Sequence, residues 1–196
     1  MARVAAVLVA LAFGTLWFRP APALVADAAP LVQPAGAFCA ADDLTLACPA
    51  QLTAAQLDSI LADYGSPAVG TGAAWIAGGA QAGINPEIAL AFFVHESTAG
   101  TAPGWAGWKP DGSSTHNVGN VTCAGYATCY GRFRDYASWD AGIADWYRLI
   151  AVEYIAGRGH RTVADVVPVY APSFENDVSG YIGAVAALVQ QWRSTP

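Results

Sequence analysis

The segment NPEIALAFFVHES, residues 85–97, predicts a helix that is buried on nearly all sides. Asn85 is a favoured N-cap residue, and Pro86 fits the first helical turn. Glu87 is favoured at the positive end of the helix dipole. No charged side chain occurs in residues 88–94, and a helix that is apolar all round is usually placed in a core. We therefore expect this helix at the centre of the domain.

Capping patterns and hydrophobic periodicity predict further helices on both sides of this segment. They are expected from the capping box Thr53–Gln56 to Gly65, over 72–82, from Ser138 to about Ile155, from Thr162 through Val167 with a stop before Pro168, and from about Asn176 to Trp192. Residues 100–134 are rich in Gly, Pro, Ser, Asn and Thr, which indicates long loops with short strands near 120–123 and 129–133. The expected class is mainly α (α+β), a helical domain with a long loop and small hairpin region.

The composition excludes several classes of protein. Of the 196 residues, 55% are hydrophobic and 12% are charged, so the chain is too apolar for intrinsic disorder. Nine Lys and Arg stand against 15 Asp and Glu, which gives a net charge of −6 with no basic run. Nucleic-acid binding and a polybasic membrane-surface helix both lack their electrostatic signature. We expect a single folded domain and a monomer.

The N-terminus is typical of an export signal over residues 1–28. Arg3 precedes an apolar stretch over 4–18, and A-x-A-like cleavage sites follow at 21–23 and 26–28. The apolar stretch is shorter than the roughly 20 residues that span a bilayer as a helix. An uncleaved anchor is the alternative, and it would be the only membrane contact. The expected location is secreted or cell-envelope, outside the cytoplasm, with a linker over 29–51 and the domain over 52–196.

Four cysteines in an exported chain predict two disulfides. Three pairings are possible, and we favour Cys39–Cys48 and Cys123–Cys129 because they close the shortest loops. The first pair would form a small loop within the linker. These spacings do not match a tetrahedral zinc site, and we predict neither a metal nor a cofactor.

Glu96 is the leading candidate for acid catalysis. It lies at the end of the most apolar helix, just before loops rich in aromatic residues. Apolar surroundings and the negative end of a helix both raise the pKa of a carboxyl group. A raised pKa keeps the group protonated near neutral pH, as a general acid requires. The alternative is an ordinary helix-end glutamate that faces solvent.

Four segments of the chain, in order, resemble the glucosaminidase family of lysozyme-like peptidoglycan hydrolases (mannosyl-glycoprotein endo-β-N-acetylglucosaminidase-like). The resemblance covers about residues 52–193. HESTAGT at 95–101 is similar to the family's E-S-x-x-G-T motif, and HNVGN at 116–120 to its H-N-x-G-N segment. GRFRDY at 131–136 is similar to its F-R-x-Y segment, and Tyr170-Ala171-Pro172 with Tyr181-Ile182 to its tyrosine-rich C-terminal portion.

The resemblance implies a lysozyme-like fold in which Glu96 is the catalytic acid. It implies a cleft floored by the Asn117–Asn120 loop and the Tyr170 region. The implied substrate and partner is the glycan strand of bacterial peptidoglycan, cut at a β-1,4 bond beside N-acetylglucosamine. A lytic transglycosylase that uses the same acid is one alternative. A lysozyme-fold module that binds the cell wall without cutting it is another.

Glycoside hydrolysis usually needs a second carboxylate, or the N-acetyl group of the substrate, beside the acid. Asp111 and Asp135 are the candidates because they lie in or next to the loop region that follows Glu96. The alternative for Asp111 is a turn residue in Pro110-Asp111-Gly112. The alternative for Asp135 is a surface or pairing acid.

Several aromatic and polar side chains are candidates for sugar binding. Aromatic rings can stack on sugar faces, and short polar side chains can hold the cleft or contact the N-acetyl group. Tyr170 could hydrogen-bond the substrate or position Glu96. The candidate substrate-binding residues are Trp105, Trp108, His116, Asn117, Asn120, Tyr126 and Tyr130. The alternative for the aromatic members is packing within the loop region.

Overall fold

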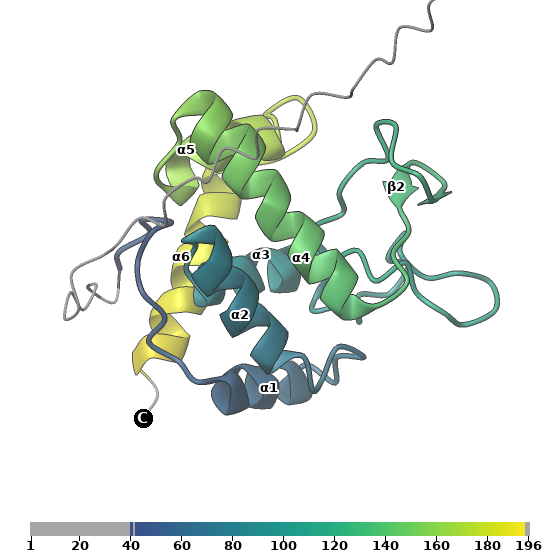
Figure 1. The fold of residues 1–196 in the computed structure, drawn as a ribbon, viewed down its shortest axis with the longest axis horizontal. Coiled ribbons are helices and arrows are strands. Elements are labelled where there is room, and N and C mark those ends of the chain that lie inside the picture. Colours follow the sequence, from purple (N-terminus) through teal and green to yellow (C-terminus); the bar gives the residue numbers. More distant parts are fainter. Residues whose placement is uncertain (1–39, 41, 195–196) are drawn as a thin grey trace, which may run out of the picture.

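The computed structural model describes residue 40 and residues 42–194 (Figure 1). Along these residues the elements are α1 (Ala54–Asp63), α2 (Gly72–Ala82), α3 (Pro86–Ser97), β1 (Cys129–Tyr130), β2 (Phe133–Arg134), α4 (Trp139–Leu149), the π-helical segment η1 (Ile150–Ala156), α5 (Val163–Tyr170) and α6 (Val178–Ser194). About 51% of the structure is helical, which confirms the predicted mainly α class with a small hairpin.

Helix α3 forms the centre of the core, as predicted. Residues 86–94 and Ser97 are buried, and the helix packs against α2 and α6. The Asn85 side chain accepts a hydrogen bond of 2.9 Å from the amide of Ile88, which is the predicted N-cap. Such a cap contributes about 1 kcal/mol. The position of this helix brings its last turn, with Glu96, to the edge of the core.

One aromatic ring of α3 joins the three C-terminal helices. The Phe92 ring centroid lies 5.3 Å from that of Trp146 on α4 and 5.4 Å from those of Tyr170 on α5 and Tyr181 on α6. Tilted and edge-to-face contacts of this kind add to the free energy gained by burial alone. The packing therefore places two tyrosines beside the turn of α3 that carries Glu96.

The chain is packed against the core before the predicted domain start at Leu52. Leu46 is 1% exposed, its amide donates to the carbonyl of Arg161 (2.8 Å), and its carbonyl accepts from the amide of Asn85 (2.6 Å). The linker expected over 29–51 therefore contributes core contacts in its described part. The predicted export signal over 1–28 lies outside the described residues. Within the residues that the structure describes, no helix is long and apolar enough to cross a membrane.

The segment between α3 and α4 lies to one side of the helices (Figure 1). Strands β1 and β2 pair antiparallel, and Thr122 forms an isolated bridge to Phe133. The predicted disulfide Cys123–Cys129 is present and ties the loop before β1 to that strand. The second predicted pair includes Cys39, which lies outside the described residues.

The prediction that the helix after Thr162 stops before Pro168 was wrong, because α5 continues through Pro168 to Tyr170. Proline removes one backbone hydrogen bond within a helix. The last turn is held by tertiary contacts, since the Tyr170 ring packs on Phe92 and its hydroxyl donates to the carbonyl of Gly119. The helix expected to reach about Ile155 is α-helical only to Leu149 and then continues as the π-helical η1.

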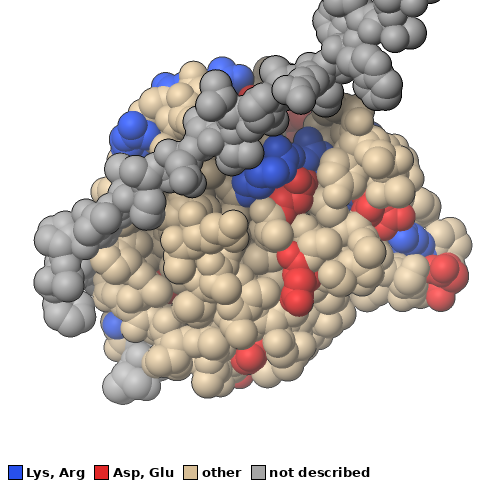
Figure 2. Space-filling model, in the orientation of Figure 1, with Lys and Arg blue, Asp and Glu red and all other residues tan. Residues whose placement is uncertain are grey.

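Charged side chains are sparse on the face shown in Figure 2, where most of the surface is neither acidic nor basic. The sparseness agrees with the 12% charged residues of the sequence.

Candidate active site

The carboxylate of Glu96 is held by two side chains from distant parts of the sequence. Oε1 accepts a hydrogen bond of 2.6 Å from the hydroxyl of Tyr181, near the start of α6. Oε2 accepts one of 2.9 Å from Nδ2 of Asn120, in the loop after α3. Helix α3 ends at Ser97, one residue after Glu96, and Thr98 at its C-cap takes the left-handed conformation. The carboxyl group therefore has a fixed orientation at the edge of the core.

Burial raises the pKa of Glu96 above its ordinary value, while the hydrogen bonds from Tyr181 and Asn120 act in the opposite direction. Desolvation is the larger effect, because a carboxylate loses more hydration energy than these two neutral donors restore. The group is held in place without an arginine or lysine contact in the described structure, so its protonated form is favoured. The upward shift expected from the apolar helix is confirmed.

Asn120 is fixed on both ends of its amide. Its Nδ2 also donates to the backbone carbonyl of Glu96 (3.0 Å), and its Oδ1 accepts 2.8 Å from Nε1 of Trp105. The indole can only donate, so it determines which way the amide points. Trp105 is buried, with 6% of its surface exposed. Its hydrogen bond reaches Asn120, which in turn binds Glu96, so Trp105 acts on Glu96 through Asn120.

The loop below the site is shaped by Asn117 and His116. Asn117 is buried, and its amide bonds the backbone N–H and carbonyl of Val121 and the carbonyl of Arg134. His116 Nδ1 donates to the carbonyl of Tyr136 at 2.7 Å. These two predicted site residues hold the backbone that presents Asn120.

Tyr170 supports the same loop from α5. Its hydroxyl donates to the carbonyl of Gly119 and accepts from Nε1 of Trp146 at 3.2 Å. Gly119 has no room for a side chain, since a Cβ there would collide with both Tyr170 and Trp146. Burial and the charge of nearby Glu96 raise the pKa of Tyr170, so its hydroxyl remains a hydrogen-bond donor.

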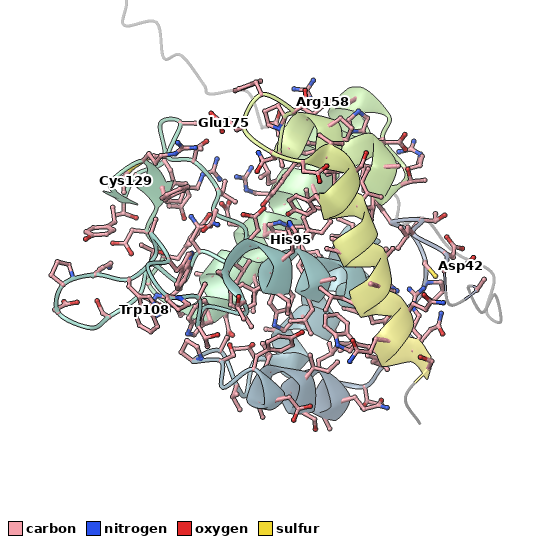
Figure 3. All side chains as sticks on the ribbon, turned by 180° about the vertical axis from the view of Figure 1, so that it is seen from behind. Asp42, His95, Trp108, Cys129, Arg158 and Glu175 are labelled. Carbon is pink, nitrogen blue, oxygen red and sulfur yellow. A yellow bond between two sulfur atoms is a disulfide. The ribbon has the colours of Figure 1, made fainter. Side chains whose placement is uncertain are left out.

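A groove of about 740 Å³ opens beside the carboxyl group, and we call it the Glu96 groove. It is lined by residues from four segments, 119–124, 132–134, 148–154 and 170–176, together with Glu96. In Figure 3, Cys129 marks the hairpin, His95 marks the helical part of the molecule, and Glu175 lies above both in this view. The α4–η1 junction forms part of the wall and brings Glu153 and Tyr154 into the groove.

The two candidates for a second carboxylate do not line this groove. Asp135 forms an ion pair of 2.8 Å with Nζ of Lys109. Asp111 accepts from the amide and hydroxyl of Ser113, as expected of a turn residue, and these bonds lower its pKa. The acids that do line the groove beside Glu96 are Glu153 and Glu175, and no sequence pattern indicates a catalytic role for either.

The remaining aromatic candidates lie outside the Glu96 groove. Trp108 is 38% exposed, with its ring edge-on to Trp105. Tyr126 packs on Tyr136, and Tyr130 belongs to β1. Of the predicted binding residues, only Asn120 lines the groove together with Glu96 and Tyr170.

Tyr181 is the site residue that sequence reasoning missed. It occurs in one of the segments that carry the family resemblance, but the resemblance implies no role for it. Its position 85 residues after Glu96 leaves no local pattern that could pair the two. The ring also packs against His95, with centroids 3.9 Å apart.

Replacing Tyr181 by phenylalanine is expected to raise the pKa of Glu96 further, because the lost hydrogen bond favours the charged carboxylate. The protonated form would then persist to higher pH. Carbon-13 NMR titration of the Glu96 carboxyl group measures the change. Tyr64→Phe, at the C-cap of α1, is the matched control and should leave the titration unchanged. A lower pKa in Tyr181→Phe would contradict the assigned role of the hydroxyl.

No group of His, Cys, Asp and Glu side chains in the described part of the chain is arranged to hold a metal ion.

Three crystal structures of autolysin E from S. aureus resemble this structure. A catalytic glutamate-to-alanine mutant in complex with the disaccharide NAG-NAM matches at a TM-score of 0.57 and 10% identity, over 80% of this chain and 73% of that one. A complex with the muropeptide NAM-L-Ala-D-iGlu matches at 0.57 and 11%, over the same shares. Autolysin E itself matches at 0.56 and 12%, over 78% and 71%.

At this level of identity the match shows a shared fold, and the predicted lysozyme-like α+β fold is confirmed. No family model matches the sequence. No curated protein sequence matches it either.

Proposed function

We propose that this chain is an exported glycosidase that hydrolyses β-1,4 bonds of bacterial peptidoglycan, of the endo-β-N-acetylglucosaminidase type, with Glu96 as the general acid. One observation carries the proposal: a carboxyl group with a raised pKa is held by Tyr181 and Asn120 inside a groove. The shared fold with autolysin E, which binds NAG-NAM in one structure, supports the choice of substrate.

The geometry suits protonation of a leaving group. Glycosidic cleavage needs an acid that protonates the bridging oxygen while the sugar develops positive charge. Tyr181 and Asn120 hold Glu96 without a full positive charge, and burial raises the pKa of the carboxyl group, which favours the protonated form that an acid needs. After transfer, the same two hydrogen bonds stabilise the carboxylate that forms.

The second step needs a group that supports the positive centre or activates water. Asp135 lies outside the Glu96 groove, and it would have to leave its ion pair with Lys109 to reach a substrate there. Glu153 already lines the groove, and the N-acetyl group of the substrate can serve the same purpose. We propose Glu153 ahead of Asp135 as the second catalytic group. The rate of fragment release is expected to fall more in Glu153→Gln than in Asp135→Asn. A larger fall in Asp135→Asn would favour Asp135 instead.

We assign the remaining site residues to positioning. Tyr170, Asn117 and His116 hold the loop that carries Asn120, and Trp105 orients the Asn120 amide. Trp108, Tyr126 and Tyr130 lie on the hairpin side, where a long glycan strand would reach them beyond the groove.

The decisive experiment is mass spectrometry of fragments released from purified peptidoglycan. Fragments with reducing-end N-acetylglucosamine are expected. Reducing-end N-acetylmuramic acid would indicate a muramidase, and products lighter by one water would indicate a lytic transglycosylase. Binding without any released fragment would indicate a cell-wall-binding module. Recovery of the cleaved chain outside the cytoplasm, lacking residues 1–28, tests the proposed export.

A further inference from the structure

The Glu96 groove carries more charge than an uncharged sugar chain requires. Three arginines line it, Arg132, Arg134 and Arg148, together with Glu153 and Glu175. Clefts lined by charge attract ligands of the opposite sign. On a chain with only 12% charged residues, this concentration calls for an explanation.

Two of the three arginines are bound to one aspartate. Arg134 Nη1 lies 2.5 Å from Oδ2 of Asp145, and Arg148 Nη2 lies 2.8 Å from its Oδ1. A single carboxylate therefore serves two guanidinium groups, and Glu153 on the same wall balances the second positive charge, so these two arginines are already committed.

Arg132 is bound much less tightly. In the described structure its ion-pair partner is Glu175, at 3.8 Å, and the two side chains are 67% and 52% exposed. An ion pair this exposed contributes little to stability. Arg132 follows Gly131 in the turn between β1 and β2, whereas Glu175 lies in the loop before α6. The pair therefore bridges two sides of the groove, and its guanidinium has donors to spare.

We infer that Arg132 binds a carboxylate of a peptide branch carried by the glycan, so that the hairpin side of the groove selects peptide-bearing strands. The inference rests on the proposed function, since it assumes that a glycan occupies the groove. A guanidinium can bind a carboxylate through two parallel hydrogen bonds, which is stronger than its long contact with Glu175. Glu175 holds the side chain at the rim and yields it to the substrate.

Two substrates and one variant test the inference. The substrates are purified peptidoglycan and the same glycan after its peptides have been removed with an amidase. Arg132→Gln is expected to lower kcat/KM about tenfold on the peptide-bearing glycan, a change of about 1.4 kcal/mol, and by clearly less on the bare glycan. Arg132→Lys should recover part of the loss, because it keeps the charge without the paired donors. Arg158→Gln, outside the groove, is the matched control.

The outcomes separate this inference from the proposed function. An equal loss on both substrates, or no loss on either, would overturn the role of Arg132 while leaving the glycosidase intact. If the wild-type chain releases no fragment from either substrate, the proposed function fails and this inference fails with it.

Discussion

Replacing Glu96 by glutamine is expected to lower kcat/KM for peptidoglycan cleavage by about three orders of magnitude, within the usual range for loss of a general acid. Glutamine has nearly the same shape as protonated glutamic acid, but its amide cannot supply an acidic proton. It can still accept from Asn120 and donate to the hydroxyl of Tyr181. The contacts of the site are therefore kept while its chemistry is removed. Release of soluble fragments, followed over time, gives the rate.

The same substitution should leave the fold at least as stable at neutral pH. The folded-state pKa of Glu96 is raised above its ordinary value. The folded chain therefore binds this proton more tightly than the unfolded chain. The free energy of unfolding falls as pH rises from the ordinary pKa through the folded-state pKa. A neutral glutamine removes this loss, so the variant should melt at the same or a higher temperature than wild type at pH 7.

Activity and melting temperature, measured together, distinguish a catalytic role of Glu96 from a structural one. Asp140→Asn removes an exposed acid in the first turn of α4 and should change neither by much. If Glu96→Gln retains most of the activity, the assignment of the acid is wrong. If it loses activity because it melts earlier, the role of Glu96 is structural.

The parts of the fold that the sequence predicted are those governed by local physics. The N-cap of Asn85 and the capping box of Thr53 involve residues three positions apart, and both are present. The run from 88 to 94 indicated burial without reference to the rest of the chain. Glu96 could be singled out for the same reason, since its helix is apolar and ends there.

The parts that could not be predicted depend on contacts between distant residues. Tyr181 meets Glu96 across 85 positions, and no periodicity connects them. Lys109 takes Asp135 as an ion-pair partner through the folding of a loop. The last turn of α5 persists beyond Pro168 because Tyr170 is bound at both its ring and its hydroxyl. In each case tertiary packing outweighs the local preference.

The two ends of α3 carry two acids with opposite surroundings. Glu87 in the first turn is fully buried and lies 3.1 Å from Nη2 of Arg193, so it meets a full positive charge. Glu96 in the last turn meets only neutral donors. The favourable end of the helix dipole also lies at Glu87 and the unfavourable end at Glu96. One helix thus holds an ion-paired acid at its first turn and, at its last turn, an acid whose pKa is raised by burial.

Replacing Arg193 by methionine is expected to lower the free energy of unfolding by about 3–5 kcal/mol, because it leaves the carboxylate of Glu87 buried without its counter-charge. The side chains of the pair are 1% and 0% exposed, so water cannot take the place of the lost guanidinium. The substitution also removes contacts to the segment before α1, since Arg193 Nη1 donates to the carbonyls of Ala40 (3.2 Å) and Asp43 (3.0 Å). Urea unfolding followed by circular dichroism measures the change.

A double-mutant cycle separates the charge from the packing. Glu87→Gln combined with Arg193→Met removes both charges, and replacing both members of a buried pair is often close to neutral. The double variant should therefore be more stable than Arg193→Met alone, although Glu87 also accepts from the backbone amides of Gln51 and Leu52 (2.6 and 2.9 Å). Arg158→Met, at an exposed position, controls for loss of a positive charge and should cost under about 0.5 kcal/mol. A cost that small in Arg193→Met would mean that the pair does not anchor α6 to the start of α3.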